Sequence, residues 1–216
     1  MSKSSNIIKF YEFTNVLKSK IRTGWQEIEI QKERLESVAE HIYGCLMIAI
    51  AIDSEYDLAL DMFKVLKMLS LHELEEILMG DLTLRADITK EEKIEMGKKY
   101  VKEITDGLFK QNEIEELLNE FNAHITKESI FCYHIDKIEC DMQAKMYDLE
   151  GVFLIEKAKE DLPFFGDRAS EIEKISKTAS DYWINYDKPR YEGDEIFKDL
   201  INEIQNKKEL SNGKDI

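Results

Sequence analysis

The chain has 216 residues, 43% of them hydrophobic, which is enough to bury one core, alone or with an appendage. Its 45 acidic and 30 basic residues give a formal net charge of −15. This balance argues against a broad nucleic-acid interface, because phosphate backbones are held by clustered Lys and Arg. A small phosphorylated substrate remains compatible, since a bound dication and one or two arginines can hold a single phosphate in an acidic protein.

Composition also bounds the fold and the compartment. Helix-forming residues dominate, and the 2 prolines and 9 glycines form no linker, so we predict an all-α protein. The cysteines Cys45, Cys132 and Cys140 form no CxxC pattern, which indicates a reduced set of thiols. The longest apolar stretch is too short to cross a bilayer and the first residues lack a signal-peptide pattern. We therefore expect a cytoplasmic protein with no membrane partner.

Helical spacing and caps predict the elements of the first half of the chain. Ser37-Val-Ala-Glu40 is a capping box that should start a helix near Val38 and place His41 in its first turns. Apolar residues between positions 57 and 79 trace one stripe, so this stretch should be helical throughout, with a possible break near His72. We expect the first helix at residues 6–19, a connector to the next helix at residues 20–36, and a loop at residues 80–88.

The second half should consist of further helices. Thr89-Lys-Glu-Glu92 is another capping box, which opens a helix towards Thr105. A long helix from about Lys127 should carry Asp136 and extend past Gly151. The remaining helices are expected at residues 112–122, 168–185 and 194–207. We predict one domain at residues 1–162 and, after the turn at residues 163–166, a helical extension at residues 163–216 packed on it.

Four residues stand out for their chemistry: His41, His72, Glu73 and Asp136. Each lies on or beside an apolar helical stripe, where a charged carboxylate is costly unless it is paired or bound to metal. A single histidine on such a face is more often a hydrogen-bonded core residue than a ligand. Two histidines and two carboxylates from three helices, however, would supply mixed nitrogen and oxygen ligands for a divalent metal.

Three motif blocks follow one another along the chain: Arg22-Thr-Gly-Trp25 with Glu36-Ser-Val-Ala-Glu-His41, Leu71-His-Glu-Leu-Glu-Glu-Ile-Leu-Met-Gly-Asp-Leu-Thr83, and Asp136-Lys-Ile-Glu-Cys-Asp-Met-Gln-Ala144. In these blocks and their order, the sequence resembles the HD-domain superfamily, in particular its HD-type 5'-nucleotidases. The resemblance covers roughly residues 22–148. It implies an HD-domain helical bundle that removes phosphate from nucleoside 5'-monophosphates, with deoxynucleotides as one candidate class.

The resemblance also implies roles for particular residues. The metal, a divalent ion such as Mn, Co, Mg, Zn or Fe, would be held by His41, His72, Glu73 and Asp136. The catalytic residues would be Glu76, which activates the attacking water, and Asp81, which contacts the sugar region and assists proton transfer. The substrate would be held by Arg22, at its phosphate, and by Trp25, as a wall of the nucleotide pocket. The resemblance further suggests a homodimer, which the apolar first helix and the helical tail could support.

The sequence departs from the family pattern at Glu73, where the superfamily has the aspartate of its His-Asp pair. Glutamate keeps the charge but adds one methylene, so the carboxylate or the backbone must shift to keep a metal–oxygen bond near 2 Å. Tyr133 stands where relatives often have lysine, and Leu84 where proline is usual. His134 should point away from Asp136, and His124 should be solvated.

Two other classes of protein are alternatives to a phosphohydrolase. The change at Glu73 leaves open a catalytically weak or inactive HD module that binds metal and nucleotide as a sensor. A di-metal carboxylate bundle would need paired Glu-x-x-His motifs. None of the four histidines has a glutamate three residues before it; those positions hold Val38, Leu69, Phe121 and Phe131. The sequence therefore disfavours the di-metal bundle.

Overall fold

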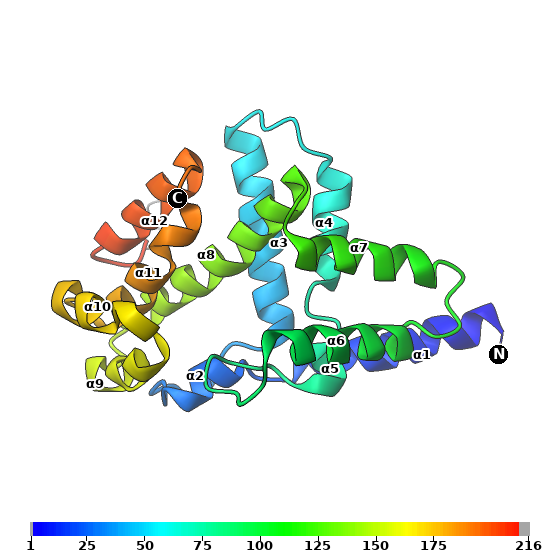
Figure 1. Ribbon diagram of the computed structural model, residues 1–216, viewed down its shortest axis with the longest axis horizontal. Helices are drawn as coiled ribbons and strands as arrows, with labels where there is room; N and C mark the ends of the chain where they lie inside the picture. Colours follow the sequence, from blue (N-terminus) through cyan, green and yellow to red (C-terminus); the bar gives the residue numbers. More distant parts are fainter. Residues whose placement is uncertain (1, 212–216) are drawn as a thin grey trace. The chain divides into compact units, whose positions relative to one another are not determined.

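The structure is a computed structural model that describes residues 2–211 (Figure 1). Within these residues the regular structure is helical, apart from one isolated antiparallel bridge between Ile21 and Ser37, so the predicted all-α class is confirmed. The α-helices are α1 (Lys3–Asn15), α2 (Thr23–Glu27), α3 (Val38–Glu55), α4 (Met62–Leu71), α5 (Glu76–Met79), α6 (Lys90–Ile104), α7 (Gln111–Ala123), α8 (Lys127–Leu149), α9 (Ile155–Ala158), α10 (Ala169–Ile175), α11 (Ala179–Asp187) and α12 (Glu195–Asn206). Short 3-10 helices cover Val16–Lys18, Lys159–Phe164, Gly166–Arg168 and Lys188–Tyr191.

The chain forms two compact units. Unit 1 comprises the described residues through Thr23 together with Glu36–Asp136, and unit 2 comprises Gly24–Leu35 and the described residues from Lys137 onward. The division falls inside α8. The predicted division into residues 1–162 and 163–216 stays a prediction. No helix in the described part of the chain is both long and apolar enough to cross a membrane.

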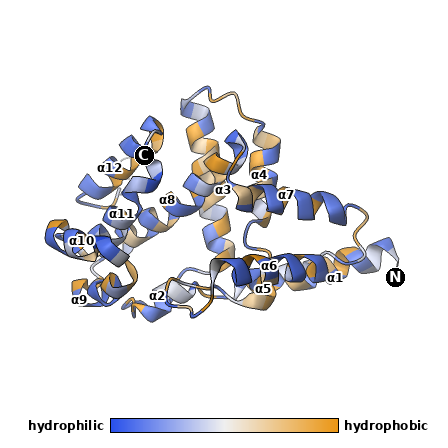
Figure 2. Ribbon diagram, in the orientation of Figure 1, coloured by the Kyte–Doolittle hydropathy of each residue, from blue (hydrophilic) through white to orange (hydrophobic). Residues whose placement is uncertain are grey.

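Unit 1 is built on the pairing of α3 with α4 and of α6 with α7. Figure 2 shows that α3 and α4 are largely apolar, whereas α7 is mainly hydrophilic. The buried residues of one core cluster in this unit come from the helices α3, α5, α6 and α7, from the short 3-10 turn after α1 and from the turns after α4: Leu17, Val38, Leu74, Ile77, Val101, Ile104 and Leu118. This packing fixes the start of α3 and the segment after α4, which together carry most of the candidate site.

The segment at residues 57–79 is not helical throughout: α4 begins only at Met62, so the predicted start is wrong, whereas the break falls near His72, where the sequence allowed one. Asp61 caps α4 by accepting a hydrogen bond from the backbone N–H of Lys64 at 3.1 Å, and α4 ends at Leu71. Turns follow through Glu75 before the short helix α5. In a continuous helix the neighbouring side chains at 72 and 73 would point about 100° apart. The turns allow both to face the same point.

Unit 2 has its own core, which includes Trp25, Tyr147, Ile172 and Tyr182. The C-terminal half of α8 contributes to it and ends at Leu149, before Gly151 with φ 73°, so the expected extension past Gly151 is wrong. The helix expected at residues 168–185 is interrupted between α10 and α11, where Thr178 and Asp181 form a capping box that starts a new helix. The last helix, α12, lies where it was predicted.

Candidate metal centre

The first histidine of the site is positioned by the capping box predicted from the sequence. The Ser37 hydroxyl accepts from the backbone N–H of Glu40 at 3.3 Å, and the Glu40 carboxylate accepts from the backbone N–H of Ser37 at 2.9 Å. Because this box fixes the first turn of α3, His41 occupies a defined place on the buried face of the helix. Its side chain is fully buried.

The other three candidate ligands come from two further segments of unit 1. His72 and Glu73 lie in the turns directly after α4. Asp136 lies on α8, where its neighbours Ile135 and Ile138 are fully buried. A carboxylate in such apolar surroundings needs partners of opposite charge. The three segments place all four side chains in one cluster.

The donor atoms of the cluster have the spacing of a metal cage. His41 Nε2 lies 3.3 Å from His72 Nε2, 3.4 Å from Glu73 Oε1 and 3.2 Å from Asp136 Oδ1. His72 Nε2 lies 3.5 Å from Glu73 Oε1 and 3.8 Å from Asp136 Oδ1. A divalent ion about 2.0–2.2 Å from each donor would hold adjacent donors roughly 3–3.6 Å apart. The residues therefore fit a divalent metal ion.

Hydrogen bonding and charge prepare these groups for that role. His72 Nδ1 lies 2.7 Å from the carbonyl oxygen of Leu69, which can only accept, so Nδ1 donates and the Nε2 lone pair faces the cluster. Burial alone would lower the pKa of His72, but the Glu73 charge and the hydrogen bond to Asp136 raise it well above its usual value, so the carboxylates favour a positive charge here, which a bound metal ion would supply in place of the proton on Nε2. Burial would raise the pKa of Glu73, but His72, His41 and Arg22 hold it well below its usual value.

Cys45, one turn after His41 on α3, was not singled out in the sequence and lies against the cluster. Its thiol is fully buried, and Sγ lies 3.7 Å from Nε2 and 3.8 Å from Nδ1 of His41. Cys45 also forms, with His41 and His72, a group of potential metal ligands whose donor atoms all lie within 4.8 Å of one another. The thiol therefore packs against the imidazole of His41 and is a further potential ligand beside the cluster. Its spacing of four residues from His41 was the available signal.

Two more of the predicted residues adjoin the metal cluster. Arg22 donates from Nη1 to Glu73 Oε1 at 3.0 Å, and its Nε lies 3.9 Å from Asp81 Oδ2. Asp81 is held in turn by the backbone N–H of Thr23, which donates to Oδ2 at 2.6 Å. The isolated bridge that includes Ser37 and a backbone hydrogen bond from Arg22 to Glu36 fix this strand-like segment. The positively charged guanidinium of Arg22 is thus held at the edge of the cluster.

Glu76 is buried at the start of α5, and its Oε2 makes no hydrogen bond to the described residues. Burial, followed by the negative charges of Glu73 and Asp81, raises the pKa of Glu76 well above its usual value. Lys20 fixes the backbone here by donating from Nζ to the carbonyl oxygen of Glu76 at 2.6 Å. A buried carboxyl with a raised pKa is suited to take up and release a proton.

The structure therefore brings together seven of the eight predicted site residues in unit 1. The eighth, Trp25, is packed in the core of unit 2, edge-on to Tyr147 with ring centroids 5.4 Å apart. His134 is buried and belongs to none of the clusters of potential ligands found in the described residues. His124 is half-buried, with its ring centroid 4.1 Å from that of Tyr133, so the expectation that it is solvated is wrong.

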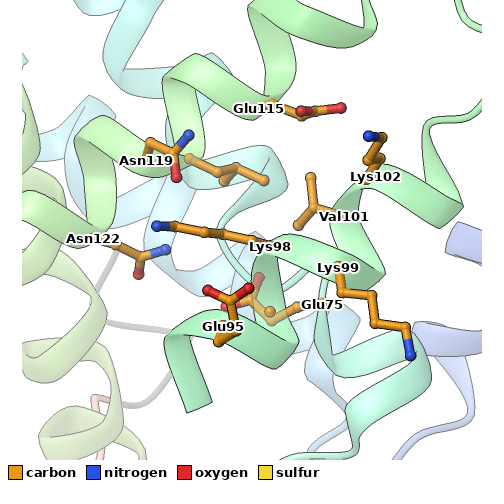
Figure 3. Close-up of a pocket in the computed structure, with 11 residues that line it drawn as sticks. Glu75, Glu95, Lys98, Lys99, Val101, Lys102, Glu115, Asn119 and Asn122 are labelled. Atoms are coloured by element: carbon orange, nitrogen blue, oxygen red, sulfur yellow. The ribbon is translucent and has the colours of Figure 1, made fainter. Parts of the chain in front are cut away.

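A separate cavity of about 350 Å³ opens between α6 and α7 (Figure 3). In the close-up, Lys98 extends between Asn119 and Asn122 on one side and Glu75 and Glu95 on the other. Its lining contains none of the eight predicted site residues. It adjoins the site segment only through Glu75, whose pKa is raised to about 7 by burial and by the charge of Glu73.

Comparison with known proteins assigns the chain to a family. The family model described as an HD domain matches residues 14–178, which is more than half of the chain. The chain belongs to the HD-domain family. The assignment made from the sequence motifs is thereby confirmed, and the HD-domain family together with the four-residue cluster supports the expected divalent-metal cofactor.

Curated relatives and solved structures agree with the HD-domain assignment. The chain is 34% identical over 162 residues to the 5'-deoxynucleotidase HDDC2 of Dictyostelium discoideum, covering 72% of this chain and 84% of that protein. It is 33% identical to the 5'-deoxynucleotidase hdd1 of Schizosaccharomyces pombe, covering 72% and 78%. A conserved hypothetical protein from Pyrococcus furiosus matches with a TM-score of 0.62 and 25% identity, covering 90% and 99%. A predicted metal-dependent phosphohydrolase from Magnetospirillum magnetotacticum shares the fold, with a TM-score of 0.60 and 19% identity, covering 95% and 96%.

Proposed function

We propose that the protein is a metal-dependent phosphohydrolase that removes phosphate from nucleoside 5'-monophosphates, with deoxynucleotides as the preferred class. The observation that carries this proposal is the cluster of His41, His72, Glu73 and Asp136, with donors 3.2–3.8 Å apart and with Arg22 bonded to it. The 34% identity to a curated 5'-deoxynucleotidase supports the choice of substrate.

The cluster of two histidines and two carboxylates would hold the metal ion. When bound, a divalent ion supplies Lewis-acid polarisation of the phosphate and of the attacking water. The ligands' own contacts support this assignment. The Leu69 carbonyl fixes the tautomer of His72 at 2.7 Å, and Arg22 orients the Glu73 carboxylate at 3.0 Å. The order of the ligands in the three sequence blocks gives the same set.

Arg22 would hold the phosphate, and the carboxyls beside it would move protons. A guanidinium can donate two parallel hydrogen bonds to phosphate oxygens. Glu76 would take the proton of the water that attacks phosphorus, since its carboxyl is buried and its pKa raised. Asp81, held by the Thr23 backbone N–H, would contact the sugar region and assist proton transfer to the leaving 5' oxygen. We assign Trp25 to the wall of the nucleotide pocket on the strength of the Arg22-Thr-Gly-Trp25 motif.

The test is phosphate release from a panel of ribo- and deoxynucleoside 5'-monophosphates by purified protein loaded with Mn²⁺, Co²⁺ or Mg²⁺. We expect release from deoxynucleotides to exceed release from ribonucleotides. Lys98→Ala, in the separate cavity, is the matched control and should release phosphate at the wild-type rate. Absence of release from every nucleotide, with metal shown to be bound, would overturn the proposal and leave the sensor module, which the comparisons do not favour.

Two finer proposals concern the assembly and its location. We infer a homodimer, because α1 has no buried residue and exposes Ile7, Ile8 and Tyr11. Light scattering coupled to size-exclusion chromatography should give twice the mass of one chain, and replacement of Ile8 with Lys should give a monomer. We also infer a cytoplasmic location, which the three free cysteines support. A fluorescent fusion that accumulated in another compartment would contradict it.

A further inference from the structure

One carboxylate oxygen serves two parts of the site. Oε1 of Glu73 accepts from Arg22 Nη1 at 3.0 Å and lies 3.4 and 3.5 Å from the Nε2 atoms of His41 and His72. The two charged side chains are largely shielded from water, at 15% exposure for Arg22 and 12% for Glu73. An ion pair in such surroundings is screened less than a surface pair. The proposed metal ligand and the proposed phosphate-binding arginine are therefore directly joined.

This contact depends on the residue type at position 73. An aspartate would carry its carboxylate one methylene nearer the backbone, which withdraws the oxygens by about 1.5 Å. If this withdrawal is directed away from Arg22 Nη1, which now lies 3.0 Å from Oε1, the carboxylate oxygen would lie beyond hydrogen-bond range. The joining of the two groups thus follows from the glutamate that this chain has in place of the usual aspartate.

We propose that Glu73 acts as a gate on phosphate binding by Arg22. Without metal, the Glu73 carboxylate occupies the guanidinium and keeps it from binding phosphate; a cation held by Glu73 would free the arginine for the substrate. A phosphate of charge near −2 must otherwise compete with Glu73 for the donors of Arg22. A dication held by Glu73 would withdraw negative charge from its carboxylate and so weaken the hold of that carboxylate on the guanidinium. Metal would then bind before phosphate, so the chain would not capture nucleotides at a site that cannot hydrolyse them. This gate rests on the phosphate-binding role proposed above for Arg22.

The test is the binding of inorganic phosphate to chelator-treated protein, followed by ³¹P NMR titration, and compared between the wild type and Glu73→Asp. This variant keeps the charge and shortens the reach, so any gain cannot come from lost negative charge. We expect it to bind phosphate about tenfold more tightly, the size of one charge-assisted hydrogen bond. Adding Arg22→Gln to the variant should abolish the gain.

Two further variants separate release of the arginine from simple electrostatics. Glu73→Gln should also tighten phosphate binding, because the amide holds the guanidinium less strongly than the carboxylate. The matched control is Asp136→Asn, which removes one carboxylate charge from beside the same histidines but leaves the Arg22–Glu73 pair in place. The gain in phosphate affinity of Asp136→Asn should be clearly smaller than that of Glu73→Gln.

The outcomes are distinct from those of the hydrolysis assay. Equal gains in Glu73→Gln and Asp136→Asn, or no gain in Glu73→Asp, would overturn the gate. Circular dichroism of each variant shows whether its helices have formed, and Glu73→Gln decides the question if Glu73→Asp does not fold. Wild-type protein that releases phosphate from nucleotides while the variants show no gain would keep the proposed function and remove only the gate.

Discussion

Replacing Ser37 with Ala should weaken both the fold and the metal site. The change removes the hydroxyl that accepts from the Glu40 N–H at 3.3 Å and that donates to Glu40 Oε2 at 3.0 Å. An N-cap of this kind contributes about 1 kcal/mol, and the buried position adds to it, so we expect a loss of about 1–2 kcal/mol. For a protein of this size that is a fall of roughly 2–8 °C in the unfolding midpoint.

The assay pairs thermal unfolding with Mn²⁺ titration by calorimetry. Because Ser37 fixes the turn that carries His41, Ser37→Ala should bind the ion several-fold more weakly. Thr89→Ala is the matched control, since Thr89 forms the same capping box on α6 and should lose about 1 kcal/mol or less at its exposed position. Its metal affinity should not change. Equal losses of affinity in the two variants, or none in Ser37→Ala, would refute the link between this cap and the site.

Three further predictions follow from the site and from unit 2. Glu76→Gln should lower kcat by about 10²–10⁴-fold, the contribution of a general base, with unchanged Mn²⁺ affinity by calorimetry. Burial and the charge of Asp187 raise the pKa of Asp141 well above its usual value, so its contribution to stability is present below that usual value and is lost as the pH rises. Asp141→Asn, which can still accept from Tyr191, should therefore raise the unfolding midpoint at pH 8 and leave it nearly unchanged at pH 3. Removing metal with a chelator should lower the free energy of unfolding by about 2.7 kcal/mol relative to protein at an ion concentration of 100 Kd, and with it the unfolding midpoint. Scanning calorimetry measures the midpoints of Asp141→Asn and of the chelated protein; an unshifted midpoint, at pH 8 for the variant or after chelation for the wild type, would contradict the prediction concerned.

Local sequence patterns predicted the elements that local interactions determine. The boxes at Ser37 and Thr89 each place a side-chain acceptor three residues before a glutamate, and both helices begin at the next residue. The stripe at residues 57–79 predicted helix throughout, with a break allowed near His72, because apolar periodicity continues across the turns. The interruption after Leu71 is determined by packing of Leu74 and Ile77 in the core of unit 1, which the spacing alone does not reveal.

The site was predictable in its members and less so in its contacts. The three ordered blocks named seven residues that the fold gathers in unit 1, although residues 22, 73 and 136 are far apart in sequence. The bond from Arg22 to Glu73 depends on tertiary distances that no motif contains. Lys20 has no signal at all, since a lysine in a connector gives no hint that it caps the carbonyl of Glu76.

The most direct test of the account measures two quantities on one preparation: the metal content and the phosphate released from deoxynucleoside 5'-monophosphates. We expect one divalent ion per chain, release of phosphate that stops on chelation, and loss of both in His41→Ala and Asp136→Ala. A protein that holds its ion at this cluster yet releases no phosphate would contradict the claim that the site is hydrolytic. Release that persists without the ion or without these ligands would contradict the claim that the cluster is the active centre.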